Sequence, residues 1–208
     1  MSQAFTLHED PRSGNCYKIR LTAALLGLPL QRRAYDNTKG ETRTPEFLAT
    51  VNSNGRIPVL QIGDTFLPES NAACWYLAEG SALIPADRFA RADMLRWMFF
   101  EQYSHEPYVA TPRFIMRHLP ADSPRRAELP QRLARGREAL AVMEKHLGTR
   151  QFFVGERYSI ADIALYAYTH VAADGGHDLA PYPQLRAWLQ RVAAQPQHVL
   201  LLERPSPR

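Results

Sequence analysis

Residues 52–73 read NSNGRIPVLQIGDTFLPESNAA, and this stretch decides the fold. Two short apolar segments, 59–62 and 65–67, are joined by Gly63-Asp64. That arrangement is a good signal for a β-hairpin with a II′-type turn. Residues 70–79 follow with the pattern of a helix. The stretch therefore predicts a strand, a tight turn, a second strand and a helix in direct succession.

The residues before this stretch switch repeatedly between strand and helix periodicity. A strand is expected at 5–7, and a helix at 16–27 whose apolar positions lie on two sides, so we expect it to be packed on both. A second strand is expected at 30–35, and Thr44-Pro45 supplies the N-cap and the first position of a short helix. The order β-α-β-α-β-β-α in residues 1–80 predicts an α/β domain.

The residues after a linker at 80–87 have helical periodicity almost throughout. Asp162 stands three residues after Ser159, where its carboxylate can reach back to free backbone N–H groups in a capping box, so Asp162 is assigned a structural role. The expected helices are 87–118 with a break near Pro107 and Pro112, one that opens at Ser123-Pro124 and continues to Leu147, 159–168 and 183–194. We therefore predict an all-helical domain at 87–208.

Composition narrows the class of protein. Of the 208 residues, 45% are hydrophobic and 22% are charged, close to the average of soluble globular proteins. No apolar run reaches the ~18 residues that suggest a membrane span, so no membrane partner is expected. The formal net charge is +4, and the arginines within 125–137 alternate with an apolar stripe. This pattern favours a solvated helix face over a nucleic-acid surface.

Cysteine usage indicates the compartment. The only two cysteines, Cys16 and Cys74, do not form a C-x-x-C pair. A reduced, cytoplasmic setting is the simple interpretation, and no metal site is expected.

The stretch that decides the fold also carries a resemblance to a known family. Residues 52–60 followed by 67–73 resemble the glutathione-binding core of cytosolic glutathione transferases, whose usual form is N-P-x-G-[KR]-[VI]-P-x-L and then L-x-E-S-x-A-I. Val154-Gly155 and residues 159–162 match the capping box of that family's helical domain, so the resemblance covers nearly the whole chain. The chain is similar to bacterial, serine-type members of theta, zeta or nu kind. It departs from the family at Ser53, where the usual residue is proline.

The resemblance implies a thioredoxin-like domain followed by an all-helical domain, a homodimer, and a cis peptide bond before Pro58. It also implies glutathione as co-substrate, which needs an acceptor for its ammonium group and donors for its two carboxylates. The implied contacts are Glu69 to the γ-glutamyl ammonium, Ser70 at a helix N-terminus to the γ-glutamyl carboxylate, the Ile57 backbone to the cysteinyl part, and Arg56, Thr42 and Lys39 to the glycine carboxylate.

The group that activates the thiol is assigned to Ser13. It precedes Lys18-Ile19-Arg20 by five residues, which matches the serine-type pattern S-x-x-x-x-[KR]-[VI]-R. An ordinary thiol pKa of about 8.5 leaves only a small fraction as thiolate at neutral pH, so an activating donor is needed. Two alternatives stay open. Asn15 matches an asparagine of bacterial relatives that resemble disulfide-bond reductases, and Cys16 is either a reactive thiol or a buried apolar residue.

A small hydrophobic electrophile is the expected second substrate. It would lie between the two domains, in contact with the loop 10–12 and with the helix that contains Tyr103, His105, Tyr108 and Arg113. These four residues also suit a helix core or a dimer interface.

The predicted function is therefore attack of the glutathione thiolate on an electrophilic carbon. One alternative is a glutathione-dependent disulfide or peroxide reductase, which Asn15 keeps open. The other is a non-catalytic, transferase-like binding module, which the retention of Glu69, Ser70 and Pro58 disfavours.

Overall fold

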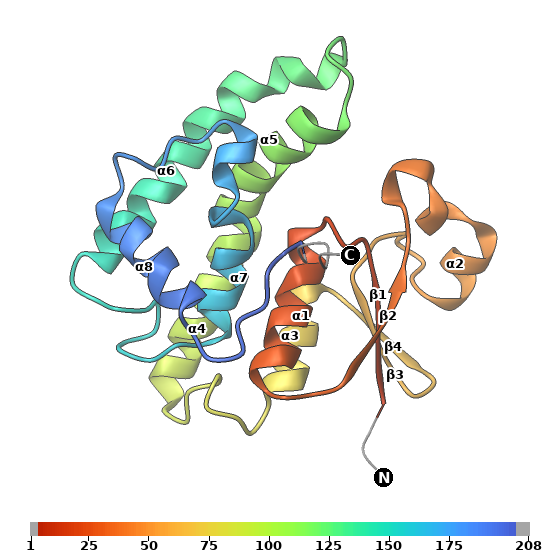
Figure 1. The fold of residues 1–208 in the computed structure, drawn as a ribbon, viewed down its shortest axis with the longest axis horizontal. Helices are drawn as coiled ribbons and strands as arrows, with labels where there is room; N and C mark the ends of the chain where they lie inside the picture. Colours follow the sequence, from red (N-terminus) through yellow and green to blue (C-terminus); the bar gives the residue numbers. More distant parts are fainter. Residues whose placement is uncertain (1–3, 203–208) are drawn as a thin grey trace, which may run out of the picture. The chain divides into compact units, whose positions relative to one another are not determined.

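The computed structural model describes residues 4–202 and divides the chain into two compact units. Among the described residues, the first unit contains 4–81 together with 196–202, and the second contains 82–195. The α/β character of one unit and the helical character of the other are confirmed (Figure 1). The segment 196–202, which the predicted helical domain 87–208 includes, groups with the first unit.

The C-terminal segment joins the first unit through α1 (Gly14–Leu25). The Tyr17 hydroxyl donates to the Val199 carbonyl at 2.7 Å, and the Arg20 guanidinium donates to the Leu201 carbonyl at 2.8 Å. α1 is buried on two sides as predicted, because all residues from Cys16 to Ala23 are buried. Part of the cover on this helix therefore comes from residues 196–202.

The sheet of the first unit has the strand order β2-β1-β3-β4. Its strands are β1 (Phe5–Glu9), β2 (Leu30–Ala34), β3 (Val59–Ile62) and β4 (Thr65–Pro68). β1 is parallel to β2 and antiparallel to β3, which is in turn antiparallel to β4. The predicted hairpin connects β3 and β4, and Gly63 has a φ of 59°, the positive value that the first position of a II′ turn requires.

Three helices complete this unit. α1 and α3 (Ser70–Ala78) lie side by side against one face of the sheet, and α2 (Pro45–Thr50) lies on the other side (Figure 1). Thr44 caps α2 as predicted, because its hydroxyl accepts a hydrogen bond from the Phe47 N–H at 3.2 Å. The order β-α-β-α-β-β-α is confirmed, and with it the thioredoxin-like arrangement.

The second unit is a bundle of helices. Its members are α4 (Arg88–Phe100), α5 (Glu106–His118), α6 (Leu129–Leu147), α7 (Ile160–Thr169) and α8 (Pro183–Ala193). The predicted break near Pro107 is a π-helical turn, Glu101–His105, between α4 and α5, whereas Pro112 lies inside α5. Ser123-Pro124 opens a 3₁₀ turn, and α6 begins only at Leu129. Within residues 4–202, no helix is long and apolar enough to span a bilayer.

α7 forms the centre of this unit and is buried along nearly its whole length. The Asp162 carboxylate accepts hydrogen bonds from the N–H groups of Ser159 at 2.9 Å and Phe153 at 3.1 Å, and from the Trp188 indole N–H at 2.9 Å. Burial raises the pKa of Asp162 to about 6, although these donors favour the ionised form. The predicted capping box is confirmed, and its carboxylate also ties α7 to α8 and to the preceding loop.

Candidate functional site

The strand register brings the predicted parts of the site to one edge of the sheet. His8 pairs with Val59, so the end of β1 lies beside the start of β3. Val59 also pairs with Pro68, so the end of β4 lies at the same edge. The segments just beyond these strand ends carry Ser13, Ile57-Pro58 and Glu69-Ser70. Segments that are far apart in the sequence therefore begin or end at the same edge of the sheet.

Ser13 is the N-cap of α1 and is half-buried. Its Oγ accepts a hydrogen bond from the Cys16 N–H at 3.4 Å, so this capping bond uses a lone pair of the hydroxyl rather than its proton. The N-terminus of a helix carries a partial positive charge, which favours an anion such as a thiolate beside it. Ser13 therefore combines a hydroxyl with an electropositive position.

The two alternatives to Ser13 lie in very different surroundings. Asn15 is half-buried in the first turn of α1. Cys16 is fully buried, and its burial raises the pKa of the thiol to about 12. Because the thiolate is the reactive form, Cys16 is an inert core residue at neutral pH. Cys74 is also buried.

An ion cluster fixes the loop that leads into Ser13. The Arg12 guanidinium contacts the carboxylates of Asp10 at 2.7 Å and Asp36 at 3.0 Å. Burial tends to raise the pKa of Asp10, but the hydrogen bonds from Arg12 outweigh it and the pKa is lowered. Asp36 follows β2, which runs parallel to β1, so the cluster connects two strand ends at the same edge.

Glu69 and Ser70 form the second part of the site. Glu69 is exposed and has a φ of 71°, a value that residues other than glycine rarely adopt. Such backbone strain persists where the surrounding structure imposes it, often at ligand sites. Ser70 is the buried first residue of α3, and the ammonium group of Lys18 lies 3.5 Å from its hydroxyl.

The segment before β3 holds Ile57 and Pro58. The Ile57–Pro58 peptide bond is cis, as predicted. Ile57 lies just outside the β1–β3 ladder, which begins at Val59. The side chain of Arg56 is exposed, and its backbone carbonyl accepts a hydrogen bond from the Asn52 side-chain Nδ2 at 2.9 Å.

The remaining predicted glycine-carboxylate contacts differ in accessibility. Thr42 is fully buried, and its hydroxyl donates to the Asn37 side-chain oxygen at 3.0 Å. Lys39 is exposed, and its ammonium group lies 3.8 Å from Asp36. Within residues 4–202, no group of three or more histidine, cysteine or acidic side chains is arranged to hold a metal ion.

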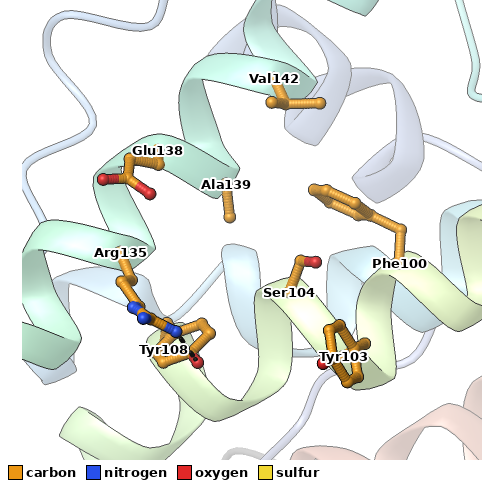
Figure 2. A pocket seen from close by; sticks show the side chains of 8 residues that line it. All are labelled: Phe100, Tyr103, Ser104, Tyr108, Arg135, Glu138, Ala139 and Val142. Atoms are coloured by element: carbon orange, nitrogen blue, oxygen red, sulfur yellow. Dashed lines mark hydrogen bonds between the residues drawn. The ribbon is translucent and has the colours of Figure 1, made fainter.

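The helical unit contains a pocket of about 430 Å³. One side of it is formed by α6, and the other by the end of α4, the π-helical turn Glu101–His105 and the start of α5. Figure 2 shows its lining: Phe100, Tyr103, Ser104, Tyr108, Arg135, Glu138, Ala139 and Val142. The Arg135 guanidinium donates to the Tyr108 hydroxyl at 2.8 Å across the pocket. Tyr103 and Tyr108, two of the predicted second-substrate residues, therefore share one concave surface.

The other two predicted second-substrate residues belong to the helix core. His105 is fully buried, and its Nε2 lies 2.9 Å from the Thr169 hydroxyl oxygen. Thr169 uses its own proton to bond the Leu165 carbonyl at 2.7 Å, so His105 is the donor in their contact. Arg113 is buried and pairs with Asp174 at 3.2 Å. The structure therefore does not bring these two side chains together with Tyr103 and Tyr108.

Models of known protein families match both units. The model described as glutathione S-transferase, N-terminal domain, matches residues 12–79, and the model described as glutathione S-transferase, C-terminal domain, matches residues 97–196. The chain belongs to the glutathione S-transferase family. The resemblance inferred from the residues around Pro58 and Ser70 is thereby confirmed.

Individual relatives agree with this assignment. The transferase is 52% identical to a glutathione S-transferase from Pseudomonas fluorescens, with a TM-score of 0.91 over 96% of this chain and 99% of that one. It is 30% identical to glutathione S-transferase 3 of Zea mays over 91% of this chain and 89% of the relative. A theta class glutathione S-transferase from Xanthomonas axonopodis pv. citri, solved with glutathione bound, is 26% identical with a TM-score of 0.85 over 94% of this chain and 95% of that one.

Sequence reasoning missed the burial of Glu9 and Lys18 in this transferase. Glu9 is fully buried and pairs with Arg20 at 3.1 Å and with Arg32. Lys18 is fully buried beside Ser70. A signal was present for Lys18, because a lysine within a helix that is apolar on two sides has few places to reach solvent. Its partner across the α1–α3 contact could not be inferred from spacing.

Proposed function

We propose that this transferase holds glutathione at the sheet edge, stabilises its thiolate with Ser13, and directs the thiolate at a small hydrophobic electrophile. The observation that supports this function is the convergence of Ser13, Ile57 and Ser70 at one edge, set by the register of β1, β3 and β4. The glutathione bound to the Xanthomonas relative agrees with glutathione as co-substrate here.

The proposed anchor matches the charges of glutathione. The γ-glutamyl carboxylate binds at the N-terminus of α3, where Ser70 supplies a hydroxyl and the helix supplies free N–H groups. The γ-glutamyl ammonium group binds the exposed carboxylate of Glu69. The cysteinyl part pairs with the Ile57 backbone, which lies beyond the end of the β-ladder.

The glycine end has fewer candidates. Arg56 is exposed and carries the charge that a carboxylate needs. The buried Thr42 hydroxyl already bonds Asn37, so we assign Thr42 to the support of this loop rather than to direct contact. Asn15, two residues after Ser13 and half-buried, is assigned a secondary contact near the thiol.

The activation step can be given a magnitude. A hydrogen bond to a charged group contributes about 1.5–3 kcal/mol, and one pKa unit corresponds to about 1.36 kcal/mol. One hydrogen bond donated by the Ser13 hydroxyl would therefore lower the pKa of the glutathione thiol by about one to two units. The partial positive charge at the N-terminus of α1 acts in the same direction. A thiol of pKa about 8.5 would then be largely ionised near neutral pH.

We also propose that the transferase is a homodimer and that the pocket in Figure 2 faces the second copy. Tyr103 is 84% exposed and Phe99, four residues earlier, is 67% exposed. Exposed aromatic side chains next to a concave surface are typical of protein interfaces. Sedimentation velocity tests this proposal: Tyr103→Glu should shift the dimer toward monomer, and a monomeric wild type would contradict it.

The experiment for the main proposal compares binding with two reactions. Glutathione affinity is measured by calorimetry, and turnover is measured with an aryl halide and with a glutathione mixed disulfide, on wild type and Ser13→Ala. We expect Ser13→Ala to keep glutathione affinity within a few-fold while aryl-halide turnover at pH 6.5 falls about 10- to 100-fold, the equivalent of one to two pKa units. Ser123→Ala is the matched control, because Ser123 precedes a 3₁₀ turn without a side-chain capping bond.

Each other outcome selects a different function. Disulfide reduction that Ser13→Ala leaves untouched, with little aryl-halide turnover in wild type, would identify a reductase. Wild-type protein that does not bind glutathione would leave only a binding module.

A further inference from the structure

Lys18 occupies an unusual place next to the proposed γ-glutamyl anchor. It lies on α1, five residues after Ser13, and its side chain is 0% exposed. Its Nζ is 3.5 Å from the Oγ of Ser70, which is 5% exposed and is the first residue of α3. The Lys18 ammonium group therefore lies next to the Ser70 hydroxyl, which we propose to contact the ligand.

The electrostatics of this position suit an anion. A helix N-terminus carries a partial positive charge, which attracts an anion. At Ser70 the N-terminus of α3 and the Lys18 ammonium group place charge of the same sign at one hydroxyl. A carboxylate bound there is attracted by both, and the low polarity of the buried surroundings strengthens the attraction.

The hydrogen-bond chemistry fixes the direction of the Ser70 hydroxyl. An ammonium group can only donate, whereas a serine hydroxyl donates one proton and accepts through its lone pairs. In the contact with Lys18, Ser70 must therefore be the acceptor. Its own proton then points elsewhere and can be donated to a ligand oxygen.

We propose that Lys18 is a positioning residue that acts through Ser70 to recognise the α-carboxylate of the γ-glutamyl group. The inference rests on the proposed function, because it assigns Lys18 to the glutathione anchor. It goes beyond the anchor in one respect: the preference of this site for a γ-glutamyl ligand over one without the carboxylate depends on a residue of α1. Lys18 itself touches Ser70, not the ligand.

The test separates this role from simple packing by changing the ligand as well as the protein. Dissociation constants are measured by calorimetry for glutathione and for the analogue in which a 4-aminobutanoyl group replaces the γ-glutamyl group. This analogue lacks only the α-carboxylate. Lys18→Met keeps an unbranched side chain of similar length without the charge, and Lys145→Met, on the exposed face of α6, is the matched control.

We expect Lys18→Met to weaken glutathione binding about tenfold, which corresponds to about 1.4 kcal/mol, and to change analogue binding less than twofold. Lys145→Met should change neither. Equal weakening for both ligands would show that Lys18 only supports the fold, and unchanged glutathione affinity would also overturn the proposal. Wild-type protein that binds neither ligand would overturn the proposed function itself.

A second set of variants tests the route through Ser70. In a Ser70→Ala background, Lys18→Met should cause little further loss of glutathione affinity, because residues that act as a unit are not additive. Additive losses would contradict a shared role. Thermal unfolding identifies any variant that does not fold, and Lys18→Gln, which is also uncharged, then replaces Lys18→Met with the same expected loss of preference for glutathione.

Discussion

Replacing Asp162 by alanine should strongly destabilise the helical unit. The carboxylate accepts four hydrogen bonds, from the N–H and hydroxyl of Ser159, the N–H of Phe153 and the indole N–H of Trp188, at 2.9–3.1 Å. All three donor residues are buried. Alanine leaves their N–H groups without this acceptor, in a place where water does not reach them.

The size of the effect follows from these donors. A buried donor without a partner costs about 1–3 kcal/mol, so three N–H groups give about 3–9 kcal/mol. Removal of the carboxylate also removes the cost of burying it, which moves the expected loss toward the lower end, about 3–4 kcal/mol. Asp162→Asn retains one acceptor oxygen, so we expect a smaller loss of about 2 kcal/mol.

Urea unfolding followed by circular dichroism measures the loss. Asp87→Ala is the matched control, because the exposed Asp87 side chain caps α4 by a single bond from the Ala90 N–H at 2.8 Å. Loss of such a cap costs about 1 kcal/mol. If Asp162→Ala destabilises the protein no more than Asp87→Ala does, the role given to the buried network is wrong.

The pH dependence of the same variants gives a further check. The folded-state pKa of Asp162, about 6, is above the ordinary value of 3.8 for an aspartate carboxyl group. Between these values the native protein binds a proton that the unfolded chain does not bind, so the contribution of Asp162 to stability grows as the pH falls through this window. The stability difference between wild type and Asp162→Asn should therefore widen from pH 7 to pH 5, and a difference that narrows would contradict the raised pKa.

Three further predictions concern the first unit. Arg20→Met removes one of the two arginines that pair with the buried Glu9 carboxylate and leaves Arg32, so it should lower the free energy of unfolding by about 1–3 kcal/mol. It should also speed proteolysis of residues 196–202, and an unchanged cleavage rate would contradict the contact of this segment with α1. Native protein should show no fast-reacting thiol with a disulfide reagent at pH 8, because burial keeps Cys16 protonated, while the denatured chain should show two; one fast thiol in the native protein would contradict this. Glu69→Gly should raise the free energy of unfolding by up to about 1 kcal/mol, because glycine adopts a φ of 71° without the steric cost, and it should weaken glutathione binding; a marked loss of stability would show that the side chain supports the fold.

The elements that were predicted well are those with a local cause. The β3–β4 hairpin follows from the turn at Gly63, and α2 from the cap at Thr44. The start of α7 follows from Asp162 three residues after its cap. In each case the interaction joins residues that are only a few positions apart, so the sequence displays both partners together.

Most of the features that the sequence did not reveal depend on contacts between segments far apart in the chain. The contact of Tyr17 with Val199 spans 182 residues, and nothing in either segment indicates the other. A break was expected near both Pro107 and Pro112, but only the first exists, as the π-helical turn Glu101–His105, and α5 continues through Pro112. Arg113 was one of four candidates for either the second-substrate surface, the helix core or a dimer interface, and only the structure shows that it is buried and pairs with Asp174.

The sequence by itself determined the family, the order of elements and the residue types of the glutathione anchor. Caps, turn residues and hydrophobic period act over a few residues, and the motif around Pro58 and Ser70 is contiguous. Only the tertiary structure decided which candidates share a site. The register of β1, β3 and β4 places Ser13, Ile57 and Ser70 at one edge, and the packing of α1 against α3 places Lys18 behind Ser70. Strand pairing and helix packing depend on surfaces contributed by distant segments, so the linear order of residues does not display them.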